Sequence, residues 1–326
     1  MSCNTPSSVK KACCTPSAER ERIEPVLSVA HRADRVRPEL AQEMITLPAS
    51  SFLMGTDYAE AFLADGEGPV REVSLSAFRI DRTPVTNDTF ARFVEQTGYT
   101  TEAERYGWSF VFWQSIPEDR WAELVEDTVA STPWWCKVSG ASWKHPEGPG
   151  SDIENRSNHP VVHLSWNDTQ AYCEWSGQRL PTEAEWEFAA RGGLVQKLYP
   201  WGDQLRDKGK HLCNIWQGEF PNVDTGEDGY QGTCPVEAFP ANGYGLYSAT
   251  GNTWEWCADW FDPAYHRAAT RIDPHGPPEG QARVMKGGSF LCHKSYCNRY
   301  RVAARSSNTP DSSTAHIGFR CAADLA

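Results

Sequence analysis

Residues 283–311 read RVMKGGSFLCHKSYCNRYRVAARSSNTPD, and the interpretation of the whole chain starts from this stretch. It contains Cys292 and Cys297, with four residues between them and with Arg299 and Arg301 close behind. Two thiolates suit a soft cation such as Cu(I), which accepts two sulfur ligands and leaves room for a third. The neighbouring positive charges favour the thiolate form. On spacing alone, however, two buried structural thiols or a disulfide explain the pair better than a metal site does.

The composition indicates a globular protein. Of the 326 residues, 40% are hydrophobic and 12% are aromatic, which is enough to build a core and excludes a disordered chain. The net charge of −12 disfavours nonspecific binding to nucleic acid or to an anionic membrane, whereas it suits a basic peptide. No stretch approaches the ~20 apolar residues of a membrane helix. We therefore expect neither a nucleic-acid partner nor a membrane partner.

The N-terminus and the cysteine count indicate a reducing compartment. Residues 1–24, MSCNTPSSVKKACCTPSAERERIE, lack the apolar run of a secretory signal, so we predict a cytoplasmic protein. The eleven cysteines are odd in number and lie in a large chain, which excludes a small secreted disulfide scaffold. In a reducing compartment most of these thiols stay free, and a closely spaced pair becomes a candidate for metal or redox chemistry.

The pattern along the chain predicts a tail followed by one large α+β domain. Residues 1–40 are poor in large apolar groups and are expected to be a flexible tail, and residues 41–326 form the domain. The alternation from Ile45 to Met54 around Pro48-Ala49 predicts a hairpin. Further strands are expected at Val73–Leu75 and Phe78–Ile80.

Three helices are predicted, and regular structure then fades. The first covers Asn87–Gln96, the second begins at Ser165, and the third begins with the capping box TEAE at Thr182 and ends at Gly192-Gly193. Residues 194–326 are rich in Gly, Pro, Asn and Trp, which predicts short strands joined by long ordered loops. The fold class is therefore α+β, as a single complex domain low in regular secondary structure.

The sequence around the cysteine pair resembles a known family. The run GGSFLCHKSYCNRYRVAARSSNTPDSS, followed by GFRCAAD at Gly318–Asp324, is similar to the C-terminal signature of the formylglycine-generating enzymes, also called sulfatase-modifying factors. The resemblance continues through HPVVHLSWNDTQAYCEWSGQRLPTEAEWEFAARGG and NIWQGEFPNVDTGEDGYQGTCPVEAFPANGYGLYSATGNTWEW. It reaches back to about Met44, so it covers nearly everything except the tail.

The resemblance implies a C-type-lectin-like fold and a copper-dependent oxidase. Such an enzyme converts the cysteine of a Cys-x-Pro-x-Arg motif, in an unfolded or extended sulfatase segment, to Cα-formylglycine with O2 and an external thiol reductant. Cys292 and Cys297 would be the catalytic, copper-binding pair. Ser289, His293 and Tyr296 would surround the reacting thiol and oxygen, and Trp254 would line the pocket. Members of the family are mostly monomers.

Two calcium sites are also implied by the resemblance. These sites have the oxygen donors that a hard cation prefers. The first would use Asn214, the carbonyl of Ile215, Asp228 and the carbonyl of Tyr230. The second would use Ser248, the carbonyls of Gly251 and Thr253, and Glu255. Family members commonly have Asn in place of Ser248, whose shorter hydroxyl makes an ordinary hydrogen-bonded turn an equal alternative.

Other cysteines gain a meaning from the same resemblance. Cys173 and Cys321 match a pair that is disulfide-linked in secreted relatives, and in a cytoplasmic protein they could instead be reduced and buried together. A second disulfide of those relatives is missing here, because its positions hold Ala190 and Val302. In the tail, residues 14–18 read CTPSA and resemble the target motif, with Arg20 two residues late. For a flexible tail, coincidence explains this several times better than self-docking as a pseudosubstrate.

Three alternatives stay open. A non-catalytic peptide- or carbohydrate-binding module of the same fold would lack the cysteine pair. An iron enzyme that joins sulfur to a histidine derivative would carry an extra helical domain with a histidine cluster. A dithiol–disulfide oxidoreductase would show C-x-x-C at a helix start, which this chain does not have.

Overall fold

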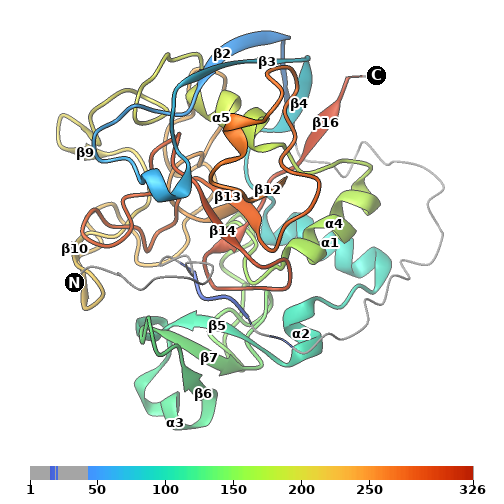
Figure 1. Ribbon diagram of the computed structural model, residues 1–326. Helices are drawn as coiled ribbons and strands as arrows, with labels where there is room; N and C mark the ends of the chain where they lie inside the picture. Colours follow the sequence, from blue (N-terminus) through green and yellow to red (C-terminus); the bar gives the residue numbers. More distant parts are fainter. Residues whose placement is uncertain (1–14, 19, 21–42, 326) are drawn as a thin grey trace.

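The two ends of the domain meet in one sheet. The computed structural model describes residues 15–18, 20 and 43–325 (Figure 1). Strands β1 (Met44–Leu47) and β16 (Ala322–Asp324) both pair antiparallel with β4 (Phe78–Asp81), in the order β1-β4-β16. The first and last strands of the domain are thus neighbours of the same strand, and the chain between β4 and β16 is anchored at both ends.

The remaining strands form small separate sheets. A four-stranded sheet has the order β14-β13-β12-β15, and its strands β12 and β15 are parallel. Its members are β12 (Trp254–Trp260), β13 (Arg283–Lys286), β14 (Ser306–Asn308) and β15 (Ile317–Gly318). A three-stranded sheet consists of β5 (Trp108–Phe112), β6 (Val125–Thr128) and β7 (Trp135–Ser139). Two-stranded pairs are β2 (Ser50–Met54) with β3 (Arg71–Leu75), β8 (Arg206–Asp207) with β9 (Lys210–His211), and β10 (Gly218–Glu219) with β11 (Val223–Asp224).

The predicted hairpin around Pro48-Ala49 is wrong. Ile45 of β1 pairs with Ile80, whereas Phe52 of β2 pairs with Val73, so the two strands belong to different sheets. A tight two-residue reversal needs positive φ at its central residues. Proline is locked near −65°, and Ala49 is not among the residues with positive φ. The chain therefore crosses from one sheet to the next at this point. The strands predicted at Val73–Leu75 and Phe78–Ile80 are confirmed as β3 and β4.

All three predicted helices are confirmed. Helix α1 (Asn87–Thr97) follows the cap Thr86 and ends at Gly98. Helix α4 (Trp166–Ser176) begins after a capping box between Ser165 and Asp168, and α5 (Glu183–Arg191) after one between Thr182 and Glu185. These caps satisfy backbone N–H groups that a helix leaves unpaired at its start.

Two short helices were not predicted. Helix α2 (Glu102–Tyr106) begins with a capping box between Thr101 and Glu104, and α3 (Trp121–Leu124) is a single turn. The letters TEAE at Thr101 repeat those at Thr182, so the signal for α2 was present in the sequence. Single 3₁₀ turns occupy Leu63–Asp65, Trp113–Ser115, Glu118–Arg120 and Tyr265–Arg267. In the part of the chain that the structure describes, no helix combines the length and apolarity needed to cross a bilayer.

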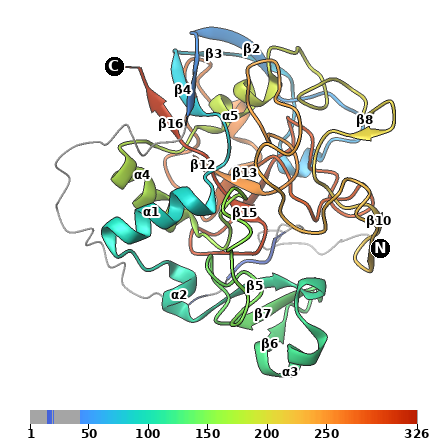
Figure 2. The same ribbon diagram turned by 180° about the vertical axis from the view of Figure 1, so that it is seen from behind.

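The elements are arranged as a body with a lobe. Sheet β5-β7-β6 and α3 lie together at one end, below the rest of the domain in both views (Figures 1 and 2). Helices α1 and α4 lie side by side on one flank, and α5 lies close to β2 and β3. The largest core cluster fills the body and includes Phe90 and Tyr172 from the flanking helices, Trp254 from β12, and both cysteines of the predicted pair.

The paired cysteines and their missing counterparts lie together as the resemblance implies. Cys173 and Cys321 are both buried, and their Sγ atoms lie 3.8 Å apart without a bond between them. Ala190 and Val302 belong to one small core cluster with Trp186. A methyl and an isopropyl group therefore fill these two positions in the core.

A buried lysine joins α5 to β13. Lys286 ends β13 and is fully buried, and its Nζ lies 3.1 Å from Glu187 Oε2 and 3.7 Å from Glu183 Oε1. Burial would raise the pKa of Glu187, but the charges of Lys286 and Arg191 and a backbone N–H from Gly55 overcome this effect and lower that pKa to about 2. Because an unpaired charge at this depth is very costly, the cluster fixes the spacing of helix and strand.

We predict that Lys286→Met destabilises the protein by about 3–5 kcal/mol, because it leaves the carboxylates of Glu183 and Glu187 short of a buried cation. The matched control is Lys197→Met. Lys197 pairs with Asp203 at the surface, where a salt bridge contributes about 0–1 kcal/mol. Urea denaturation of the three proteins measures both effects. Equal losses in the two variants would show that the buried cluster has no special role.

The same cluster predicts a pH dependence of stability. The folded-state pKa of Glu187, about 2, lies below the unfolded value of about 4.3. The unfolded state therefore binds more protons in this window, so the free energy of unfolding falls as the pH drops from about 4.3 towards 2. Glu187→Gln should weaken this acid-side slope in urea titrations at fixed pH. An unaltered slope would contradict the assignment.

Candidate functional site

The cysteine pair lies in an irregular loop that folds back on itself. Beyond Lys286, Gly287 and Gly288 have φ values of 94° and 75°, a region that side chains rarely adopt. A Cβ on Gly288 would lie 2.9 Å from the Cα of Tyr300. The glycine thus allows the start of the loop to touch its far side, and the loop closes around the cysteines.

Three ion pairs attach this loop to the body. Each joins an arginine of the loop to a carboxylate far away in the sequence, and each pair is buried or nearly so. Their shortest distances are 2.6 Å for Arg299–Asp65, 2.6 Å for Arg301–Glu67 and 2.7 Å for Arg305–Glu183. Planar guanidinium groups hold carboxylates in fixed orientations, so these pairs replace the hydrogen-bond ladders that the loop lacks.

The two sulfurs converge inside the loop. Cys292 is 2% exposed and Cys297 is fully buried, and their Sγ atoms lie 3.0 Å apart. The N–H of Ser289 points at Cys292 Sγ over 3.4 Å, and the N–H of Cys297 donates to the carbonyl of His293 at 2.8 Å. Both thiols are thereby held by the backbone and face each other away from solvent.

Ser289 and His293, two of the residues expected around the thiols, belong to the loop itself. Ser289 is buried, and its Oγ accepts the N–H of Leu291 at 3.3 Å. His293 is half-buried, with Nδ1 2.8 Å from Ser295 Oγ; burial first and the charge of Lys294 second lower its pKa. The imidazole is therefore neutral at pH 7.

Aromatic rings form the wall beside the cysteines. Tyr296 stacks on Phe220, with ring centroids 4.3 Å apart and planes at 6°, and meets Trp134 edge-on at 5.1 Å. Trp254 is fully buried in the same core cluster as both cysteines, and its indole Nε1 has no hydrogen-bond partner among the described residues. The indole N–H groups of Trp134, Trp135, Trp143 and Trp216 also lack a partner among the described residues, so this feature is shared by several tryptophans of the core.

Sequence reasoning missed Trp216 and Phe220. The N–H of Trp216 donates to the carbonyl of Cys292 at 3.2 Å, and its ring meets Phe220 edge-on at 5.2 Å. Both residues lie in the run NIWQGEF, in which the family resemblance implies roles only for Asn214 and Ile215. Nothing in their spacing relates them to Cys292, because 76 residues separate Trp216 from that cysteine.

The donor set suits a soft monovalent cation. Two buried sulfurs face each other, and in the described ranges no three His, Cys, Asp or Glu side chains lie close enough together to hold a metal. Cu(I) accepts two thiolates, whereas zinc and calcium need more ligands or oxygen ligands. Cys292 and Cys297 therefore fit Cu(I).

The first predicted calcium set is gathered in one loop region. Asp228 accepts the N–H of Ile215 at 3.1 Å and the N–H of Tyr230 at 3.0 Å, and Gln217 Nε2 contacts both Asp228 and the carbonyl of Ile215. Asn214 donates to the carbonyl of Gly232 at 2.7 Å. The oxygen donors of this set share one small region.

The second set has its carboxylate engaged elsewhere. Both oxygens of Glu255 accept hydrogen bonds from Arg320, at 2.6 and 2.7 Å, and Trp186 Nε1 donates to one of them at 2.7 Å. Ser248 Oγ donates to the carbonyl of Val236 at 2.8 Å. A buried arginine already balances the charge of Glu255, so calcium at this set stays a prediction with less support than the first.

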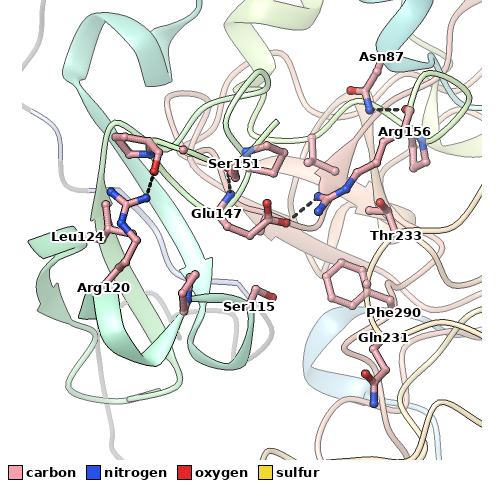
Figure 3. Close-up of a pocket in the computed structure, with 18 residues that line it drawn as sticks. Asn87, Ser115, Arg120, Leu124, Glu147, Ser151, Arg156, Gln231, Thr233 and Phe290 are labelled. Carbon is pink, nitrogen blue, oxygen red and sulfur yellow. Dashed lines mark hydrogen bonds and ion pairs between the residues drawn. The ribbon is translucent and has the colours of Figure 1, made fainter. Parts of the chain in front are cut away.

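Two cavities lie near the loop. One, of about 280 Å³, is lined by His293, Lys294 and Tyr300 on one side and by Ile215 and Trp216 on the other. A larger cavity of about 590 Å³ lies between the lobe and the body, and Phe290 forms part of its wall. Figure 3 shows its Arg156 and Glu147 pointing toward one another; they form an ion pair at 2.6 Å. Neither cysteine of the pair lines either of these two cavities.

The chain is similar to proteins named formylglycine-generating enzyme. A formylglycine-generating enzyme from Thermomonospora curvata is 62% identical over 289 residues, covering 88% of this chain and 95% of the relative. One from Bos taurus is 56% identical over 288 residues, covering 88% and 76%.

The fold has a solved counterpart, and a family model matches most of the chain. The structure of PvdO from Pseudomonas aeruginosa superposes with a TM-score of 0.65 at 25% identity, covering 88% of this chain and 96% of PvdO. The predicted α+β, C-type-lectin-like fold is thereby confirmed. The model of the sulfatase-modifying factor enzyme 1-like domain matches residues 30–325. The chain therefore belongs to the sulfatase-modifying factor enzyme 1-like family.

Proposed function

We propose that this protein oxidises a cysteine in the Cys-x-Pro-x-Arg motif of sulfatases to Cα-formylglycine, using O2, copper and an external thiol reductant, and so activates the sulfatase. The observation that carries the proposal is the buried pair Cys292 and Cys297, with Sγ atoms 3.0 Å apart. Relatives named formylglycine-generating enzyme support it.

The reaction balances without any further reagent. The target thiol, O2 and two reductant thiols give the aldehyde, hydrogen sulfide, one disulfide and water. Cys292 and Cys297 would hold the copper, which supplies the affinity for the target thiolate and the redox chemistry with O2. The protein itself has to place the target Cβ and to keep bulk water away from it.

The residues around the pair suit these tasks. The aromatic wall of Tyr296, Phe220 and Trp134 excludes water from one side of the loop. The unpartnered Nε1 of Trp254 can donate to an oxygen atom that arrives at the pocket. His293 adjoins Cys292 in the chain, and burial lowers the pKa of its imidazole, which favours the neutral form beside the pair. The three arginine anchors keep the loop rigid while an extended peptide binds.

We also propose that calcium binds at Asn214, Ile215, Asp228 and Tyr230, with a structural role. The carboxylate of Asp228 and the carbonyl of Ile215 both contact the amide of Gln217, so a small rotation of that side chain would free two oxygens for the ion. Calcium there would fix the segment that carries Trp216, whose N–H holds the carbonyl of Cys292.

The oxidase proposal predicts that Cys297→Ser loses more than about 100-fold in kcat/KM, because a hydroxyl does not replace a soft thiolate ligand. The assay is mass spectrometry of the peptide LCTPSR with copper-loaded protein, O2 and a thiol reductant. The matched control is Cys136→Ser, which alters a buried thiol in a separate core cluster. Full activity in Cys297→Ser would refute the mechanism. No conversion and no copper uptake by the unaltered protein would favour a binding module.

The calcium proposal predicts that Ca²⁺ raises Tm by about 5 °C at 100-fold excess over Kd, and that Asp228→Asn abolishes this rise. Thermal unfolding is measured with Ca²⁺ and with EDTA. Glu227→Gln serves as the control, because this exposed neighbour pairs with Arg206 and belongs to neither donor set. An equal Ca²⁺-dependent rise in Asp228→Asn would exclude the site.

A further inference from the structure

A short piece of the N-terminal region is packed onto the domain. Of residues 15–18 and 20, Thr15 is 2% exposed and Ala18 is 4% exposed. The segment runs beside β5, between the lobe and the C-terminal part of the chain that follows β14 (Figures 1 and 2). Its contacts reach residues nearly 300 positions away in the sequence, so they do not follow from local chain geometry.

Two of these contacts involve the backbone of the segment. Asn308 Nδ2 donates to the carbonyl of Pro16 at 2.9 Å, and Asn308 Oδ1 accepts the hydroxyl of Ser17 at 2.8 Å. The Oγ of Ser312 accepts the N–H of Ala18 at 2.8 Å. Bonds to main-chain groups hold an extended peptide irrespective of most of its side chains. This groove therefore has the properties of a peptide-binding site.

Arg20 fills a site built for a guanidinium group. Its Cζ lies 4.4 Å from the ring centroid of Tyr106 and 4.5 Å from that of Trp108. It donates to the carbonyls of Asp311 and Trp108 and to Ser313 Oγ, at 2.9, 3.1 and 2.9 Å. Stacked rings and several acceptors together select arginine over other side chains.

Carboxylates near this site add attraction for a cation. Burial lowers the pKa of Arg20, and the charges of Glu102, Asp168 and Asp311 oppose this effect. The side chains of Thr15–Ala18 are uncharged, so only Arg20 is attracted by these carboxylates. The groove is therefore complementary to a peptide with an arginine near its C-terminal end, which is the chemistry of the proposed target.

The groove adjoins the cysteine loop. Ala18 packs in one core cluster with Phe290 and Leu291, the two residues that precede Cys292. Trp216, whose N–H binds the carbonyl of Cys292, belongs to the same cluster. A peptide in this groove thus lies against the wall of the proposed active site.

The sequence of the segment copies part of the target motif. Residues 14–17, CTPS, match the first four positions of Cys-x-Pro-x-Arg. Ala18 stands where the motif has arginine, and Arg20 follows two positions later. The proline and an arginine are both present, but with a spacing that the motif does not have.

We propose that residues 15–18 and 20 occupy the groove in which the Cys-x-Pro-x-Arg segment of the target binds, and compete with it as an intramolecular pseudosubstrate. The inference rests on the proposed function, since that function defines the target. A sulfatase segment must displace Pro16, Ser17 and Arg20 before its own cysteine reaches the pair. Arg20 makes more of the polar contacts than any other residue of the segment, with three hydrogen bonds and two ring contacts, so it contributes most to the binding of the segment in the groove.

The test compares the full-length protein with Arg20→Ala. Release of the competitor lowers KM for LCTPSR by about tenfold, and the change is confined to KM, because the competent fraction of free protein rises. Arg20→Lys, which keeps the charge but not the planar fork, should lie between the two. Arg79→Ala is the charge-matched control, since Arg79 is an exposed residue of β4 at the other end of the domain (Figure 1).

A binding measurement separates this inference from the proposed function. Fluorescence anisotropy gives Kd for a labelled LSTPSR peptide, which cannot be oxidised. Tighter binding to Arg20→Ala, with no conversion of LCTPSR by any protein, would uphold the competition and refute the oxidase. Conversion by the unaltered protein with the same KM and Kd in Arg20→Ala would refute the competition and leave the oxidase intact. Weaker binding to Arg20→Ala, or no binding to any variant, would also overturn the pseudosubstrate.

Discussion

The buried ammonium group of Lys286 is the contact on which the geometry of the site depends. It lies between two glutamates of α5 at the residue where β13 ends and the cysteine loop begins. Separating Lys286 from these glutamates would leave unpaired charges in the interior, so α5 and β13 are held at a fixed spacing. The same Glu183 also receives Arg305 from the far end of the loop. Both ends of an irregular segment are thus fixed on one helix.

This arrangement explains how a chain with so little regular structure can hold two sulfurs in place. The four-residue β13 ends at Lys286. In the loop that follows, guanidinium–carboxylate pairs fix the backbone where no strand pairing does so. Gly288 allows the close approach that closes the loop. Such a framework positions side chains well and leaves the surface beside it available for an extended peptide.

The sequence was sufficient for features that depend on neighbours in the chain. Caps at Ser165 and Thr182 predicted α4 and α5 because their partners lie three residues away. The hairpin at Pro48-Ala49 was wrong because alternation marks a strand without naming its partner. The pairing of Arg301 with Glu67 spans 234 residues and leaves no trace in spacing. The cysteine pair was identified by family resemblance, and Trp216 was missed because its contact with Cys292 runs through the backbone.

Covalent attachment gives the packed N-terminal segment a property that a free inhibitor lacks. Arg20 and the groove belong to one molecule, so the local concentration of the segment is the same in a dilute solution and in a crowded cell. The occupancy of the groove therefore does not report how much of this protein is present. A target peptide displaces the segment only if its own affinity and concentration are high enough to compete with this constant local concentration. A polypeptide that has a cysteine without the rest of the motif would bind too weakly to displace the segment.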